Sequence, residues 1–348
     1  MVLHGVYFIQ NADISGVLCW EGVQVSVRAK SPWNGPDAKE LDSPVLQELW
    51  FVKASNNTGY YTTYTLRNLK SGQYMIADRN GLHISVRYQS QDQSHLWTIT
   101  EDPPGTMLYG IRNVRSRCVS NSMTLLNLIL TKNPSFAQHC SALLGRNNRR
   151  WLFQRVSRSG VELKQILQRS VNLKYNEPQV DKDYLILPEG YFRAIWNSIP
   201  KTPLRDGIYD SSEMAIVFKA AVATWGSLNI KGALKKPGYD PNADDGPAIL
   251  CGFVIARLKK SQDTGDDSDT GDDSDTGDDS DTHDDSDTVD DSDTDDDSET
   301  HDDPDTHDDS DQEDLQKYMH YNFTLSDDYN QIRYFDPGPE AGDFEVRS

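Results

Sequence analysis

The sequence predicts two folded domains: an all-β domain made of three repeated units, then a mixed α+β domain that an acidic low-complexity run interrupts. Three observations support this prediction. A short strand pattern recurs three times within residues 1–155. Beyond them, apolar residues also recur at the spacing of three and four that is typical of helices. Finally, residues 263–311 carry 26 Asp or Glu and no Lys or Arg, and such a composition builds no core.

Each repeated unit opens with the same five-residue pattern. Tyr7–Asn11, Tyr64–Asn68 and Tyr109–Asn113 each alternate a large apolar residue with a tolerant position and end at Asn, as a strand entering a turn does. Each unit closes on a strand with a tryptophan, and these tryptophans are Trp50, Trp97 and Trp151. One unit of short strands buries no apolar face alone, whereas three units closed around a pseudo-threefold axis do. We therefore expect residues 1–155 to form one domain with the three tryptophans buried.

This repeat is similar to the ricin-B lectin family, whose fold is the β-trefoil. The family's Gln-x-Trp element has decayed here to QELW at 47–50, SHLW at 94–97 and NRRW at 148–151. The resemblance implies a carbohydrate-binding domain, in which each site uses an early Asp, an aromatic platform and a polar residue near the Gln-x-Trp element. Leu18, Ile76 and Ser120 stand where that Asp belongs, so all three units depart from the pattern.

The middle unit keeps most of the family's site. Tyr88 stands where the family has the aromatic platform, and Asp92 and His95 lie near the polar positions. Asp78 lies two residues beyond Ile76 and is a substitute for the missing Asp after a shift of the loop. The alternative interpretation is that each of these four residues is an ordinary exposed polar residue without a role in binding. The resemblance implies glycans of the galactose type as partners of this unit.

The second domain begins with a connecting segment, residues 156–182, that has a helical tendency. Residues 183–188 predict a strand that Pro188 ends. A helix is expected next, from the apolar residues Phe192, Ile195, Trp196 and Ile199. Asp210 and Glu213 then form a capping-box signature ahead of an apolar helix that Gly226 is expected to end.

The segment YDSSE at 209–213, with FKAAVATWG after it, resembles a fungal chimerolectin family. That family joins a ricin-B trefoil to a papain-like, calcium-dependent protease domain. The likeness continues through ILCG at 249–252, YNFTL at 321–325 and YFDP at 334–337. The resemblance implies a papain-like agglutinin C-terminal domain over residues 183–348 and a homodimer that associates through it.

The catalytic positions of the family hold different residues here. Ser211 takes the place of the nucleophilic cysteine, Met319 that of the basic histidine and Asp336 that of the carboxylate. A hydroxyl is a far weaker nucleophile near neutral pH unless a base sits beside it. His320 lies one position along, and in a strand a shift of one residue points the side chain to the opposite face. The resemblance thus implies a catalytically dead domain, with a Ser211–His320–Asp336 hydrolase as the alternative.

The family's calcium ligands include acidic residues of the same segment. Asp210 and Glu213 match two of the acidic positions, while Ser212 replaces a third. Fewer oxygens and less charge weaken calcium binding, so we expect a weak or absent site. Helix capping alone also explains Asp210 and Glu213. The sequence indicates no other cofactor.

The net charge of −21 is local to the acidic run, because the other 299 residues carry 34 Lys or Arg against 29 Asp or Glu. From Asp263 to Asp311 a hexad, Asp-Thr-x-Asp-Asp-Ser, repeats about eight times. We expect a disordered, solvated spacer in a surface loop, or else a run that binds calcium weakly and collectively. The low pI therefore says nothing of the folded domains' partners, and we expect no nucleic-acid binding.

The cysteines and the lengths of the apolar segments indicate in which cellular compartment the protein is expected. Four scattered cysteines show no metal-binding spacing and are expected to fill cores, and these are Cys19, Cys118, Cys140 and Cys251. The first residues lack the features of a secretory signal, and no stretch approaches the ~18 apolar residues of a membrane span. We therefore expect a cytoplasmic protein that does not insert into membranes.

Two classes of function stay open. The first is a carbohydrate-binding protein of the fungal chimerolectin kind, not catalytic, that recognises foreign glycans in defence. The second is a β-trefoil protease inhibitor or protein-interaction scaffold that binds no glycan.

Overall fold

The computed structural model describes most of both folded domains. The described residues are 2–35, 43–57, 62–77, 84–87, 93–115, 119–122, 136–139, 150–169, 174–175, 181–200, 211–231, 246–257, 318–326, 328–336 and 345–347. The chain divides into two compact units, residues 1–257 with 318–348 and residues 258–317. The acidic run at 263–311, expected to be disordered, lies outside the described residues.

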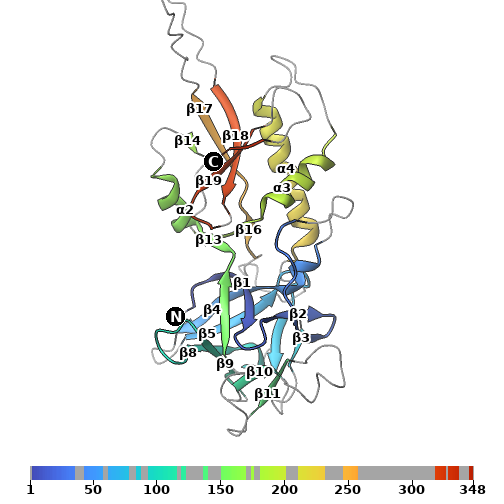
Figure 1. Cartoon of the computed structure of the whole chain (residues 1–348), viewed down its shortest axis with the longest axis vertical. Coiled ribbons are helices and arrows are strands. Elements are labelled where there is room, and N and C mark those ends of the chain that lie inside the picture. The colour runs from blue at the N-terminus through green and yellow to red at the C-terminus, as the bar shows by residue number, and fades with distance from the viewer. Residues whose placement is uncertain are drawn as a thin grey trace, which may run out of the picture. The chain divides into compact units, whose positions relative to one another are not determined.

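The first domain is a twelve-stranded antiparallel structure (Figure 1). Its strands are β1 (Gly5–Asn11), β2 (Gly16–Glu21), β3 (Gln24–Ala29), β4 (Leu49–Asn57), β5 (Thr62–Asn68), β6 (Tyr74–Ala77), β7 (Ile84–Arg87), β8 (Trp97–Glu101), β9 (Tyr109–Asn113), β10 (Val119–Ser122), β11 (Phe136–His139) and β12 (Trp151–Arg155), and its short 3-10 helices are η1 (Pro44–Glu48) and η2 (Gln93–His95). Six strands close a ring in the order β1, β4, β5, β8, β9, β12 and back to β1. The other six form the hairpins β2–β3, β6–β7 and β10–β11. This is a β-trefoil, so the predicted fold is confirmed.

The three tryptophans occupy equivalent places in the trefoil core. Across the ring they pair with the repeated tyrosines: Trp50 with Tyr7, Trp97 with Tyr64 and Trp151 with Tyr109. The indole N–H of Trp50 donates to the carbonyl of Leu18, and that of Trp97 to the carbonyl of Met75, both at 3.0 Å. All three indoles are fully buried, as predicted.

A buried asparagine ends each repeated pattern. The side-chain oxygens of Asn11, Asn68 and Asn113 each accept the backbone N–H two residues further on. Asn68 and Asn113 also donate their side-chain amides to two carbonyls at the start of a tryptophan strand of the preceding unit. Because these polar groups are satisfied, the asparagines are stable in the core and tie one unit to the next.

The second domain is an α+β structure (Figure 1), and its described residues form two sheets and three helices. The smaller sheet has the order β13 (Ser157–Ser159), β15 (Asp183–Leu185) and β16 (Ala248–Ile249). The larger sheet has the order β14 (Lys174–Tyr175), β17 (Gly252–Arg257), β18 (Tyr318–Leu325), β19 (Ile332–Asp336) and β20 (Glu345–Arg347). The helices are α2 (Gly160–Leu167), α3 (Glu189–Ser198) and α4 (Ser211–Asn229).

Within residues 156–182, two described segments pair with strands of the second domain. Strand β13 pairs with β15, and β14 pairs with β17. Helix α2 begins at a capping box formed by Ser159 and Glu162, and its Leu163 packs in a core with Phe323. Strands of two and three residues carry too little periodicity to be recognised in a sequence, which explains the difference.

Helix α4 continues three residues beyond Gly226, where the sequence predicted its end. A Cβ atom at Gly226 would stand 2.6 Å from Cδ1 of Ile249. The glycine therefore allows the helix to lie close to β16, and it does not serve as a C-cap. Asp210, the predicted N-cap, lies outside the described residues.

An apolar cluster joins the trefoil to the second domain. Strand alternation in β1 sends Tyr7 and Ile9 into the trefoil core, whereas Phe8 faces the other way. Phe8 belongs to a buried cluster that includes Phe192 of α3 and residues of α4. The two domains' backbones approach closely here, because Gly35 and Gly190 lie in contact and neither has room for a Cβ atom.

Two of the four cysteines can be placed. Cys19 and Cys251 are free and buried, as expected, while Cys118 and Cys140 lie outside the residues whose side chains are described. No helix in the described ranges is long and apolar enough to cross a membrane.

Candidate functional site

In the first trefoil unit, Trp33 and Glu48 make structural contacts. The ring of Trp33 lies 5.8 Å from that of Phe8 and 5.1 Å from that of Tyr191 on α3. The carboxylate of Glu48 is fully buried and accepts hydrogen bonds from the Arg28 guanidinium at 3.1 Å and from the Ser31 hydroxyl at 2.6 Å. A buried carboxylate needs such partners to offset its lost hydration. Glu48 is therefore closed to a ligand, and Trp33 is partly covered by its contacts with Phe8 and Tyr191.

The threefold repeat shows which residues of the first two units are equivalent. The hydrogen bonds from the indoles of Trp50 and Trp97 make Leu18 equivalent to Met75, whereas the sequence comparison had matched Leu18 with Ile76. Leu18 and Met75 are both fully buried in the trefoil core, and Ile76 is 5% exposed. At these equivalent positions both units therefore have apolar residues in the core. Ser120 lies in β10, where only the backbone is described.

In the middle unit, one of the four predicted site residues lies in the described part of the chain. His95 ends η2 and packs edge-on against Tyr74, with the ring centroids 6.4 Å apart. Both side chains are half-buried. Tyr88, Asp92 and Asp78 lie outside the described residues.

Tyr74 was not among the site residues that the sequence predicted. It follows the asparagine of its unit by six residues, a place that Val17 takes in the first unit and Val119 in the third. The repeat alone therefore contained the signal, since only the middle unit has an aromatic residue there. Tyr74 and His95 together offer an aromatic surface beside a polar group, the pairing that suits a sugar ring.

In the second domain, the family's catalytic positions fall on α4, β18 and β19. Ser211 is the first residue of α4, and Met319 and His320 are consecutive residues of β18 that pair with Ala256 and Ile255. Asp336 ends β19. The side chains of Ser211, Met319 and Asp336 are not among those described.

The larger sheet turns one face towards α4, and Asn322 identifies it. Its side-chain amide donates to the carbonyl of Ala215, one turn into α4, at 3.0 Å. His320 lies two residues before Asn322, so alternation places it on the same face. Met319, the neighbouring residue of β18, belongs to the opposite face. His320 and not Met319 is therefore on the face that meets α4.

His320 nevertheless lacks the surroundings of a catalytic base. Its ring stacks on Phe253, with the centroids 5.3 Å apart and the planes at 25°. No carboxylate among the described residues forms an ion pair with it. A histidine that serves as a general base is normally oriented by such an acceptor on its second nitrogen.

The predicted calcium ligands give no assembled site in the described residues. Glu213 is exposed in the first turn of α4, where its carboxylate accepts a hydrogen bond from the Ser212 hydroxyl at 3.2 Å. Asp210 lies outside the described residues. Within the described ranges no three His, Cys, Asp or Glu side chains gather as metal ligands would. Glu213 alone supplies too few oxygens to hold Ca²⁺.

Comparison with known proteins supports both domains. Residues 184–267 match the family model described as Agglutinin C-terminal. The crystal structure of Polyporus squamosus lectin, bound to the epitope Neu5Aca2-6Galb1-4GlcNAc, is similar over 100% of this chain and 98% of its own, with a TM-score of 0.65 and 17% identity. A structure described as the PSL1a–E64 complex is similar over 99% of this chain and 98% of its own, with a TM-score of 0.61 and 18% identity. No curated protein sequence matches the chain significantly.

Proposed function

Because the chain carries an agglutinin C-terminal domain and has the fold of Polyporus squamosus lectin over its whole length, we propose that it is a carbohydrate-binding, lectin-like protein. The observation that carries the proposal is the likeness over the whole chain, trefoil and second domain together, to a lectin whose structure holds a sialylated glycan. The partners would be glycans, of the galactose type, recognised as foreign in defence. Binding of labelled protein to an array of immobilised glycans tests this.

We assign the binding site to the middle unit of the trefoil. The pair of Tyr74 and His95 supports this assignment, because it places an aromatic ring beside a polar group at one end of the β6–β7 hairpin. Tyr88, Asp92 and Asp78 complete the proposed site. Two residues of the first unit make it the weaker candidate for this site. Trp33 packs against Tyr191, and Glu48 forms a buried ion pair with Arg28.

The second domain, in this proposal, hydrolyses no peptide bond and holds calcium weakly or not at all. A serine in the place of the nucleophile and a histidine stacked on Phe253 support inactivity. The domain would instead associate with a second copy, and the dimer would supply the valency that agglutination requires. We place this activity in the cytoplasm.

A specific observation also favours a second candidate, a protease inhibitor or protein-interaction scaffold without glycan binding. Leu18 and Met75 place apolar side chains in the core at the positions related to the family's acid, which removes the usual acceptor for sugar hydroxyls. If the parent protein binds no glycan on the array, the scaffold becomes the better account.

A further inference from the structure

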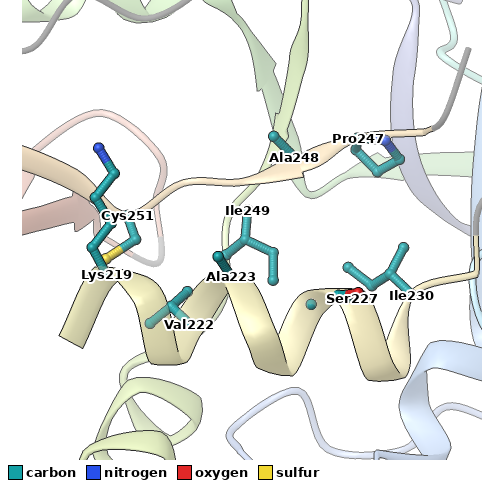
Figure 2. Close-up of a pocket in the computed structure, with 10 residues that line it drawn as sticks. Lys219, Val222, Ala223, Ser227, Ile230, Pro247, Ala248, Ile249 and Cys251 are labelled. Atoms are coloured by element: carbon teal, nitrogen blue, oxygen red, sulfur yellow. The ribbon is translucent and has the colours of Figure 1, made fainter. Parts of the chain in front are cut away.

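A hollow of about 490 Å³ lies along the second half of α4 (Figure 2). One wall is a face of the helix, formed by residues three and four positions apart from Lys219 to Ile230. The opposite wall is the extended segment 247–251, which includes β16. At 1.5 Å per helical residue the wall from Lys219 to Ile230 is about 16 Å long. The volume is within the range of small-molecule sites.

Among the described lining residues, one at one end is charged and the others are uncharged. Lys219 lies at the same end as Cys251, while Ile230 and Pro247 lie at the other (Figure 2). Burial raises the pKa of the Cys251 thiol to about 12, so this neighbour is a neutral thiol at pH 7. The ammonium of Lys219 is therefore the single charge among the lining residues that the structure describes, and none of these residues is a carboxylate that could balance it.

We propose that this hollow, here called the α4 pocket, binds a small amphiphile with a carboxylate head and an unbranched apolar tail. The carboxylate pairs with Lys219, and the tail lies along Val222, Gly226 and Ile249 towards Ile230. Gly226 and Ile249 lie in close contact along this path, because a Cβ atom at Gly226 would stand 2.6 Å from Cδ1 of Ile249. Each methylene that leaves water adds about fourfold to the affinity, and the charge-assisted bond selects the head group. The proposal is independent of glycan binding, since it concerns the other domain.

Calorimetric titration of the full chain with decanoate, below its micelle concentration, tests the pocket. We expect saturable binding of one decanoate per chain, with decanol bound about tenfold more weakly because it lacks the charge. Lys219→Met keeps the apolar stem, so it should reduce decanoate binding to the level of decanol and leave decanol unchanged. Ala223→Phe, which fills the pocket from the helix side, should reduce the binding of both about tenfold or more.

Ala220→Phe is the matched control, because Ala220 is exposed one turn earlier on α4 and does not line the pocket. It should bind decanoate as the parent does, and both variants should show the helical circular dichroism of the parent. Absence of decanoate binding by the parent would overturn the proposal. Equal loss in Ala220→Phe and Ala223→Phe would overturn it as well, and so would a Lys219→Met variant that binds decanoate as tightly as the parent.

Discussion

The indole ring of Trp33 lies 5.1 Å from the phenol ring of Tyr191, and this contact joins the trefoil to the second domain. Trp33 would be an obvious sugar platform in an isolated trefoil. In the whole chain it packs against the cluster that contains Phe8 and α3. The hydroxyl of Tyr191 is also hydrogen-bonded to that of Ser43, so the contact has a polar part as well. This part of the first unit thus forms an interface between the domains.

Replacement of Trp33 should destabilise the protein as a core mutation does. We expect Trp33→Ala to lower the free energy of unfolding by about 3 kcal/mol, measured by urea denaturation. Trp33→Phe should recover most of this loss, because the buried indole N–H has no hydrogen-bond partner in the described part of the chain. Equal stability of Trp33→Ala and the parent would show that the contact does not form in solution.

Gly190 should not tolerate a side chain, although it lies in the first turn of α3. Alanine normally favours a helix over glycine by about 1 kcal/mol. At Gly190, however, a Cβ atom would collide with the backbone oxygen of Asn34. We expect Gly190→Ala to lower the melting temperature, at a cost of about 1–3 kcal/mol. Asn197→Ala, at an exposed site of the same helix, should have little effect, and a gain in stability for Gly190→Ala would contradict the close approach of Gly35 to α3.

Stability should fall in acid because of Glu162. Burial raises the pKa of this carboxyl, but hydrogen bonds from Ser159 and Arg155 lower it by more, so that the pKa lies below its ordinary value of 4.5. A lowered folded-state pKa contributes stability that is complete above the unfolded value and is lost as the pH falls through the folded one. Urea denaturation should show this loss below pH 4.5. Glu162→Gln should be less stable at pH 7 and should show a smaller loss in acid; an unchanged pH profile would contradict the assignment.

Casein should remain uncleaved by the parent protein, with or without calcium. Ser211→Cys should also be inactive, because His320 stacks on Phe253 and has no carboxylate ion pair among the described residues. The assay is release of acid-soluble fragments, with Ser211→Ala as the reference for background. If Ser211→Cys gains calcium-dependent cleavage and loses it again on adding His320→Ala, the domain retains a working base.

The trefoil fold could be predicted from the sequence, because each residue type that recurs in the three units has a single structural role. Trp50, Trp97 and Trp151 fill the core, and the repeated asparagines close the turns, so spacing alone reveals three units. The second domain was harder. Strands such as β14 and β16 are two residues long, and their pairing depends on contacts distant in the chain.

Two features near the candidate sites could not be predicted from the sequence, for physical reasons. The sequence alternation of β18 does not show which of its two faces meets α4. The hydrogen bond from the side chain of Asn322 to the carbonyl of Ala215 shows it, and this bond is visible only in the structure. Likewise, the loss of Trp33 to the domain contact depends on α3, more than 150 residues away. Tyr74, by contrast, was visible in the repeat, since Val17 and Val119 take its place in the other units.

Binding of glycans by the parent and by Tyr88→Ala, compared on one array, tests the account most directly. Tyr88→Ala should reduce the signal for every bound glycan about tenfold or more, because stacking of the sugar's apolar face on an aromatic ring would be lost. His95→Ala should weaken the same glycans to a smaller degree. Trp33→Phe, which keeps the contact between the domains, should bind as the parent does. If Tyr88→Ala binds like the parent while Trp33→Phe does not, the site lies in the first unit, and if the parent binds no glycan, carbohydrate recognition is not the function of this chain.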